Sequence, residues 1–402
     1  MTETAMRRER VLRQIPSGIW ALGFVSLLMD VSSEMIHGLL PVYLVGVMGA
    51  SALAVGAIEG VAESTALITR IFSGVLSDWL GKRKLLAALG YGLAAASKPI
   101  FPLANSLGWV VAARFIDRIG KGVRGAPRDA LIADIAPEKL RGASFGLRQA
   151  LDTVGAFLGP GLAVLLMLAS RNDFRLVFWW AVLPAVLSTA LIVFAVREPK
   201  VARAKGAARF PLRPSELRRL GTRFWIVAAI AAVFSLARFS EAFLILRARS
   251  DGLGEAYAPL VLVVMNLVYA LSAYPAGALS DRLGRRGVFL AGIALLIAAD
   301  LTLAAAGTLV WVAAGLVLWG LHMGFTQGLL SALVADTAPA DLRGTGFGAL
   351  NLVTGVAALA ASLIAGALWD RVGPQATFGA SAALALLSLI GVGLGARALK
   401  AP

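Results

Sequence analysis

The sequence predicts an all-α membrane protein with twelve transmembrane helices, arranged as two six-helix bundles related by pseudo-two-fold symmetry. Three observations lead to this prediction: an apolar composition, apolar stretches long enough to cross a bilayer, and an internal repeat that divides the chain in two. The prediction makes the lipid bilayer both the solvent and the first partner of the chain.

The composition sets the class. Of 402 residues, 58% are hydrophobic and 15% are charged, whereas in a soluble domain the apolar share is nearer half and the charged share nearer a quarter. Apolar stretches recur along the chain, for example at Ile19 to Leu28, Leu85 to Ala96, Phe224 to Leu236, Phe289 to Ala299 and Ala376 to Ala396. Cysteine is absent, so the sequence offers no disulfide framework and no thiolate metal site.

The distribution of basic residues predicts the topology. The formal net charge is +15, yet the basic residues concentrate in the segments that alternate connections would place inside, as the positive-inside rule requires. The segments predicted to lie outside hold Arg171, Arg175, Arg247, Arg249 and Arg371. We therefore expect a protein of the bacterial inner membrane with both termini on the cytoplasmic side. We expect no nucleic-acid partner. The first apolar run carries Asp30 and Glu34, and we interpret it as a retained helix, not a signal peptide.

An internal repeat divides the chain. The segment Gly74-Val-Leu-Ser-Asp78-Trp-Leu-Gly81-Lys82-Arg83 returns as Gly277-Ala-Leu-Ser-Asp281-Arg-Leu-Gly284-Arg285-Arg286. A second motif, which contains Asp134, Leu140, Arg141 and Gly142, returns at nearly the same spacing with Asp336, Leu342, Arg343 and Gly344. Two motifs repeated in the same order indicate a duplicated six-helix unit. We expect one bundle over 1–196, a basic cytoplasmic linker over 197–222 and a second bundle over 223–402.

These motifs resemble the signature loops of the major facilitator superfamily, and the resemblance covers the full length. It implies an alternating-access transporter in which the loops form a conformational latch. The residues carried over to that latch are Gly74, Asp78, Gly81, Lys82, Arg83, Asp134, Arg141, Asp281, Arg285, Arg286, Asp336 and Arg343. An alternative interpretation takes the basic residues as topology signals alone.

Two further segments resemble the proton-coupled exporters of this family. Arg114 begins a stretch similar to the R-x-x-Q-G-x-G sequence of their fourth helix, with Asp117 and Arg118 in place of the usual Gln and Gly. The predicted fifth helix carries Gly146, Gly155, Gly159 and Pro160 in the register of the exporters' glycine–proline motif. Such glycines allow close helix packing, and the proline weakens the helix where the protein must bend.

Charged residues inside predicted helices mark the candidate functional site, because such residues are costly in a bilayer unless they face a partner or a wet cavity. The candidates for proton coupling or substrate binding are Asp30, Glu34, His37, Glu59, Glu63, Arg114, Asp117, Arg118, Lys121, Arg238 and Glu241. Asp30, Glu34 and His37 lie on one stripe of the first helix. The second half is poorer in such groups, with Asp300 alone on the ninth helix and His322 on the tenth. We therefore expect coupling chemistry in the first half.

Less specific interpretations stay open for several candidates. Glu59 and Glu63 can lie in water at the end of their helix, Arg238 and Glu241 can form a self-neutralising pair, and Lys121 can anchor the fourth helix at the lipid headgroups. The sequence predicts no metal site, no cofactor and no enzyme, because it lacks a phosphate-binding glycine loop with its lysine, an H-E-x-x-H pair and a G-x-S-x-G elbow.

The expected function is secondary active transport of a small solute, driven by protons that buried carboxyl groups carry. Export by antiport is favoured by the glycine–proline motif. The alternatives are proton-coupled uptake of an anionic metabolite or metal chelate by symport, and a membrane receptor on the same scaffold. We expect a monomer.

Overall fold

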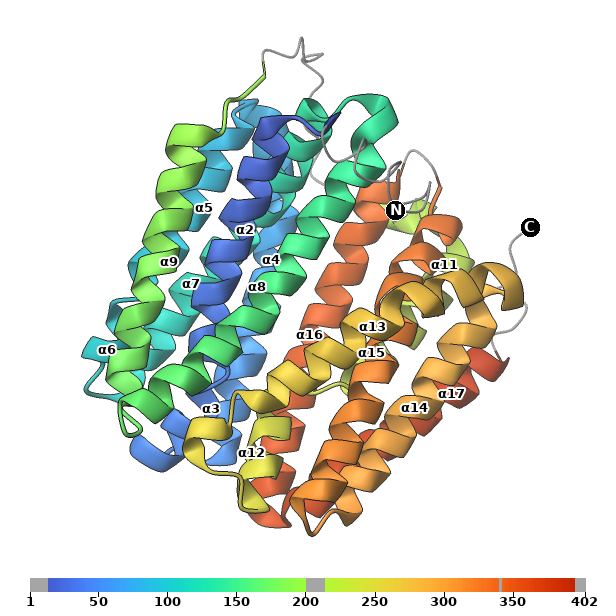
Figure 1. Ribbon diagram of the computed structural model, residues 1–402. Coiled ribbons are helices and arrows are strands. Elements are labelled where there is room, and N and C mark those ends of the chain that lie inside the picture. The colour runs from blue at the N-terminus through green and yellow to red at the C-terminus, as the bar shows by residue number, and fades with distance from the viewer. Residues whose placement is uncertain (1–13, 200–213, 340–341, 395–402) are drawn as a thin grey trace, which may run out of the picture. The chain divides into compact units, whose positions relative to one another are not determined.

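The computed structural model describes residues 14–199, 214–339 and 342–394, and every regular element in these ranges is helical (Figure 1). Nine of the described helical segments are long and apolar enough to cross a membrane. Three further segments complete the predicted set of twelve. They are α5 (Arg83–Ser97) with α6 (Ile100–Leu103), the charge-rich α7 (Leu107–Ile135), and α11 (Gly221–Leu236) with α12 (Ala242–Ser250).

The chain forms two compact units, one of residues 1–36 and 69–209 and the other of 37–68 and 210–402. Residues 37–68 precede the predicted linker but join the second unit, because the first part of α4 (Ala52–Leu80) packs against α16 (Arg343–Arg371). A Cβ on Gly60 would lie 3.1 Å from Ser362 Cβ. Asp370 of α16 also accepts hydrogen bonds from the backbone nitrogens of Ala52 (2.9 Å) and Leu53 (2.8 Å) at the start of α4. The predicted bundle boundaries stay a prediction.

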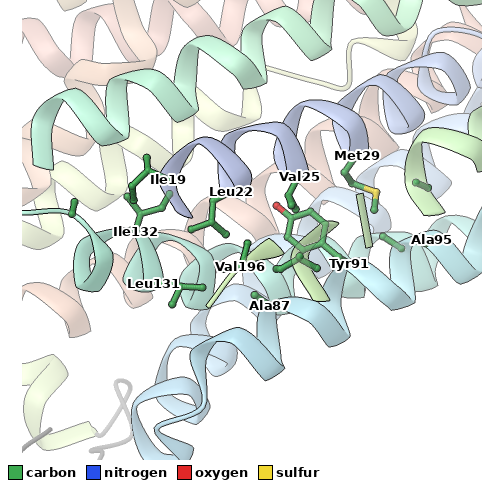
Figure 2. Close-up of a cluster of buried hydrophobic side chains, with 14 of the residues drawn as sticks. Ile19, Leu22, Val25, Met29, Ala87, Tyr91, Ala95, Leu131, Ile132 and Val196 are labelled. Atoms are coloured by element: carbon green, nitrogen blue, oxygen red, sulfur yellow. The ribbon is translucent and has the colours of Figure 1, made fainter. Parts of the chain in front are cut away.

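The first unit contains most of α2 (Ser17–His37), the end of α4, α5 to α7, α8 (Arg141–Ala169) and α9 (Phe174–Ala195). Its apolar core lies where α2 meets α5, α7 and α9. In Figure 2 the side chains of Leu22 and Val25 on α2 face Tyr91 on α5. Helices α5 and α7 cross closely at Gly90 and Gly120, where a Cβ on Gly120 would lie 2.6 Å from the Gly90 carbonyl oxygen. This crossing fixes the charged face of α7 beside α5.

The second unit is built on the helices of the second half. They are α10 (Pro214–Arg219), α11, α12, α13 (Leu260–Leu283), α14 (Arg285–Ala305), α15 (Leu309–Thr337), α16 and α17 (Pro374–Leu394). Helix α14 packs between α15 and α17, and α15 also packs against α13. Gly320 permits the last contact, since a Cβ there would lie 2.7 Å from the Met265 carbonyl oxygen.

The first predicted helix of each half is interrupted. Helix α2 ends at His37, and a short α3 (Leu40–Val42) and a π-helical turn, η1 (Tyr43–Val47), follow it. Helix α11 ends at Leu236, and α12 resumes at Ala242. The second interruption contains neither glycine nor proline. Side chains satisfy its backbone groups instead: Ser362 Oγ accepts from the Ser240 nitrogen (3.3 Å), and Ser381 Oγ donates to the Ala237 carbonyl (2.5 Å). A break inside a membrane is tolerated when its polar groups are satisfied in this way.

Large apolar side chains cover the outside of the helices. Phe72, Phe194, Tyr274, Leu271 and Val310 are among the exposed residues. In water such a surface would drive aggregation, whereas against lipid it costs nothing. Their exposure therefore supports the bilayer as the surroundings of this fold.

Candidate functional site: buried charges in each unit

The interior of the first unit contains a charge cluster centred on Asp117. Lys98 Nζ donates to Asp117 Oδ1 at 2.8 Å and to Ser33 Oγ of α2 at 3.0 Å. Asp117 Oδ2 lies 3.9 Å from Arg114 Nη1 and 3.8 Å from Arg118 Nε. Each of these four charged side chains belongs to a residue that is at most 4% exposed. Three cations therefore share one carboxylate in a poorly solvated place.

Local structure explains this arrangement. Lys98 follows the last residue of α5 and precedes Pro99, which is the N-cap of the short helix α6. On α7, Arg114, Asp117 and Arg118 are three and four residues apart, so they project from one face. We call Lys98, Arg114, Asp117 and Arg118 the α7 cluster.

Helix α8 lies directly against the acidic face of α2. A Cβ on Gly155 would lie 2.7 Å from the Leu27 carbonyl oxygen and 3.0 Å from Asp30 Cβ. A Cβ on Gly159 would lie 2.7 Å from the Val31 carbonyl oxygen and 2.8 Å from Glu34 Cβ. No larger residue fits at either position without moving the helices apart. The glycines of α8 thus bring its backbone to Asp30 and Glu34.

The same packing brings a further carboxylate to Asp30. Asp152 lies three residues before Gly155 on α8, and it acts electrostatically on Asp30 together with Arg124, Lys121 and Glu34. Asp152 pairs with Arg148, whose Nη1 lies 2.5 Å from Asp152 Oδ2. Its other oxygen, Oδ1, is buried and has no hydrogen-bond partner among the described residues. We call Asp30 and Asp152 the acid pair.

Further polar contacts are made by α7, starting at Arg124, which acts electrostatically on Asp30. The Arg124 guanidinium lies 4.8 Å from the centre of the Tyr91 ring. The Tyr91 hydroxyl is 3.1 Å from Ser26 Oγ, to which Arg128 Nη1 donates at 3.0 Å. Arg128 also pairs with Asp129 at 3.2 Å. These contacts connect α2, α5 and α7 beside the apolar core of the unit.

The second unit contains the remaining candidates for proton coupling or substrate binding. His37 Nε2 lies 3.6 Å from Glu59 Oε2, at the end of α2. Arg238, in the break between α11 and α12, interacts electrostatically with Glu241 and Glu63. Glu59 is buried, whereas Glu63 is exposed. The interruptions of both first helices thus lie beside titratable side chains.

Of the predicted latch residues, Arg83 is the centre in the first unit. Its Nη1 lies 2.7 Å from Asp134 Oδ1 and donates to the Ala130 carbonyl at 2.8 Å, and its Nη2 lies 3.4 Å from Asp78 Oδ1. The structure therefore joins the two repeated motifs of the first half through one guanidinium. Gly81 ends α4 with a φ of 63°, a conformation that favours glycine.

Other latch residues take simpler positions. Lys82 and Arg141 are exposed at the starts of α5 and α8. Gly74 packs toward α7, with its Cβ position 3.4 Å from Ala126 Cβ. In the second unit Gly284 has a φ of 83°, and Arg286 Nη2 donates to the Gly393 carbonyl at 2.9 Å. The side chains of Asp281, Arg285, Asp336 and Arg343 lie outside the described part of the structure.

The remaining glycine–proline residues behave differently from Gly155 and Gly159. A Cβ on Gly146 would meet no described atom within 4 Å, so close packing does not require glycine there. Helix α8 continues without interruption through the buried Pro160.

Comparison with known proteins identifies the family. The family model described as Major Facilitator Superfamily matches residues 22–248 and 242–402. The chain belongs to the major facilitator superfamily. An uncharacterised MFS-type transporter of Methanocaldococcus jannaschii is 33% identical over 386 residues, which cover 94% of each chain. The quinolone resistance protein NorA of Staphylococcus aureus is 26% identical over 228 residues, covering 56% of this chain and 57% of that protein.

Solved structures of major facilitator proteins share the fold. A peptide transporter named POT aligns with a TM-score of 0.79 at 16% identity and covers 95% of both chains. The nucleoside transporter NupG aligns with a TM-score of 0.73 at 14% identity, covering 96% of this chain and 100% of that one. The prediction of an all-α membrane protein with the major facilitator fold is thereby confirmed.

Within this major facilitator protein, sequence reasoning missed two buried charges. Lys98 was overlooked although it is a lysine inside a predicted membrane segment, which is itself a functional signal. Asp152 was overlooked although it lies one turn before Gly155.

Proposed function

We propose that this major facilitator protein exports a small solute in exchange for protons, and that the acid pair of Asp30 and Asp152 carries the proton. The observation that supports this proposal best is the close packing of α8 on α2 at Gly155 and Gly159. It holds two carboxylates of different helices at one half-buried interface. Two such groups repel each other when both are ionised, so the interface has a built-in reason to bind one proton.

A proton on the acid pair would also change the packing force between the helices. With both carboxylates ionised, α2 and α8 repel at this point, and Arg124, Lys121 and Arg148 supply the compensating charge. With one proton bound, that repulsion disappears. Binding and release of a proton can therefore bias the position of α8 against α2, which is the coupling that alternating access requires.

The interruptions at His37 and Ala237 support a substrate site in the second unit. Transporters of this architecture bind their substrates near the middle of the bilayer, where membrane helices are interrupted. His37, Glu59, Glu63, Arg238 and Glu241 lie at or near these breaks. We propose that these side chains contact the solute. We further propose that the protein works as a monomer in a bacterial inner membrane, with both termini on the cytoplasmic side.

Export is favoured for two reasons. A transporter confers drug resistance by lowering the drug concentration inside the cell, and one similar protein is named a quinolone resistance protein. A cationic solute on the carboxylates of the second unit and a proton on the acid pair would each favour a different conformation, so binding of one would promote release of the other. Negative coupling of this kind produces antiport.

Uptake of an anion by symport is the second candidate, and the α7 cluster favours it. Three cations contact one carboxylate in this cluster, and such a concentration of basic groups can attract an anionic solute to the interior of the first unit. An anion would bind better when the acid pair holds a proton, and the two would then move together.

Transport in proteoliposomes distinguishes these candidates. Vesicles with purified protein would be loaded with ethidium, a cationic dye, or fluorescein, an anionic dye, and a pH gradient would be imposed in either direction. Antiport predicts that ethidium moves in the direction opposite to the flow of protons down their gradient. Symport predicts fluorescein flux in the direction of the gradient. Fluxes of both dyes that ignore the gradient would contradict proton coupling altogether.

A further inference from the structure

Asp300 is a buried carboxyl group that the proposed mechanism does not use. It lies on α14 in the second unit and is 0% exposed. Its Oδ1 has no hydrogen-bond partner among the described residues, and its Oδ2 lies 2.5 Å from Ser381 Oγ on α17. An ionised carboxylate in such a place would carry a large desolvation cost without a cation to offset it.

The hydrogen count around Ser381 decides the protonation state. Ser381 Oγ lies 2.5 Å from the Ala237 carbonyl oxygen and 2.5 Å from Asp300 Oδ2. A hydroxyl has one hydrogen to donate, and the carbonyl can only accept. Two contacts this short both need a hydrogen. The second hydrogen must come from Asp300, which then donates to Ser381 Oγ while Ser381 donates to Ala237.

This chain of hydrogen bonds ends at the break between α11 and α12. The Ala237 carbonyl belongs to the residue that closes α11, where the helix offers no further backbone donor. If Asp300 loses its proton to water, the Ser381 hydroxyl turns to the carboxylate. The Ala237 carbonyl then loses its donor, and a buried carbonyl without a donor is destabilising.

Titratable side chains of several elements contact α14, the helix of Asp300, or the residue that follows it. His322 of α15 binds the Gly292 carbonyl of α14 through Nδ1 at 3.0 Å. Arg247 of α12 donates to the carbonyls of Leu303, at 2.9 Å, and Ala306 at the end of α14, and it pairs with Asp251 at 3.4 Å. Ser381 is the one side chain that interacts with Asp300 itself among the described residues. The guanidinium of Arg247 is thus occupied by other acceptors.

We infer that Asp300 is a second proton-binding site, whose proton closes the hydrogen-bond chain from Asp300 through Ser381 to Ala237 and thereby holds the helix break in place. Asp300 lies in the opposite half of the sequence from the acid pair, and its proton binding does not depend on the proposed export. Loss of its proton loosens the segment that carries Arg238 and Glu241. A proton bound here therefore controls the geometry of those two side chains.

Thiol labelling at the break tests this inference, because the natural chain has no cysteine. Ser240→Cys places a single thiol in the break, and Thr308→Cys places one at an exposed turn as a control for ionisation of the thiol itself. The maleimide labelling rate of the first, divided by that of the second, should rise with pH by about two- to tenfold, the factor that corresponds to one hydrogen bond. Adding Asp300→Asn should hold the ratio at its low-pH value, because the Asn amide donates to Ser381 at every pH. An unchanged pH response in the Asn variant would overturn the inference.

A second measurement does not depend on labelling or transport. Infrared difference spectra between low and high pH should show the carbonyl band of a protonated carboxyl group, and the Asp300→Asn substitution should remove that band.

If the Asn variant does not fold, Ser381→Ala replaces it in the labelling experiment. This variant lacks the hydroxyl between Asp300 and Ala237 and should give fast labelling of the break at every pH. A pH-dependent ratio that persists in Ser381→Ala, or an infrared band that is insensitive to Asp300, would contradict the assignment.

Discussion

The ammonium group of Lys98 lies 2.8 Å from the carboxylate of Asp117 in the interior of the first unit, and both residues are almost fully buried. This pair joins the end of α5 to the middle of α7. Arg114 and Arg118 lie within 4 Å of the same carboxylate. Asp117 therefore contacts three cations, whereas Lys98 is one of three cations that contact Asp117.

This asymmetry predicts different costs for the two partners. Asp117→Asn should destabilise the protein by about 3–5 kcal/mol, because it removes the carboxylate that contacts three buried cations. Lys98→Gln should cost less, because two arginines still face Asp117. Thermal unfolding in detergent measures both, and Lys139→Gln, an exposed position shortly after α7, serves as the control with a change below about 0.5 kcal/mol. Equal losses for Asp117→Asn and Lys98→Gln would contradict the cluster.

The packing of α8 on α2 predicts a sharp contrast between two glycines. Gly159→Ala should destabilise the protein by about 1–3 kcal/mol and reduce transport, because its Cβ would lie 2.7 Å from the Val31 carbonyl oxygen. Gly161→Ala, on the same helix with no described atom within 4 Å of its Cβ, should be neutral or stabilise by up to about 1 kcal/mol. Similar behaviour of the two variants would show that this interface is not tightly packed.

The Arg83 contacts predict another pair of outcomes. Arg83→Ala removes a guanidinium that pairs with Asp134 and donates to the Ala130 carbonyl, so we expect a loss of about 1–3 kcal/mol in the free energy of unfolding. The neighbouring Lys82 is exposed, and Lys82→Ala should change stability by less than about 0.5 kcal/mol. Unfolding midpoints in detergent compare the two. A larger loss for Lys82→Ala would reverse our assignment of the central residue.

Asp370 caps the start of α4 from the end of α16. Asp370→Ala should cost about 0.5–2 kcal/mol, the range for removing a side chain that caps a helix N-terminus. Asp370→Asn keeps one acceptor oxygen and should recover part of that loss. Thermal unfolding again supplies the measurement, and an Asn variant as unstable as the Ala variant would argue that charge, and not hydrogen bonding, matters there.

The fold could be predicted from the sequence because its signals are periodic and repeated. Apolar stretches of membrane length and two motifs repeated with the same order suffice for the two-bundle prediction. The close approach of α8 was also predictable, since Gly155 and Gly159 lie at a spacing that favours helix contact. The partner was not: that these glycines meet Asp30 and Glu34 depends on how α2 and α8 pack, which no local pattern encodes.

Other features depend on contacts distant in sequence. The break after Leu236 has no glycine or proline to announce it, because serines of α16 and α17 stabilise it. The sequence identifies Asp300 as a lone charge in its predicted helix. Its inferred role depends on a contact with Ser381, which is 81 residues away and could not be predicted from a local pattern. The capping of α4 by Asp370 likewise joins positions that the sequence separates by more than half the chain.

Proton-driven transport with the acid pair altered tests the central claim most directly. Wild type, Asp30→Asn, Asp152→Asn and the control Asp173→Asn, an exposed cap of α9, would be compared in proteoliposomes for flux under a pH gradient and for exchange at equal pH. We predict that Asp30→Asn and Asp152→Asn retain exchange but lose the response to the gradient, while Asp173→Asn behaves as wild type. A gradient response that survives in both acid-pair variants would contradict the account.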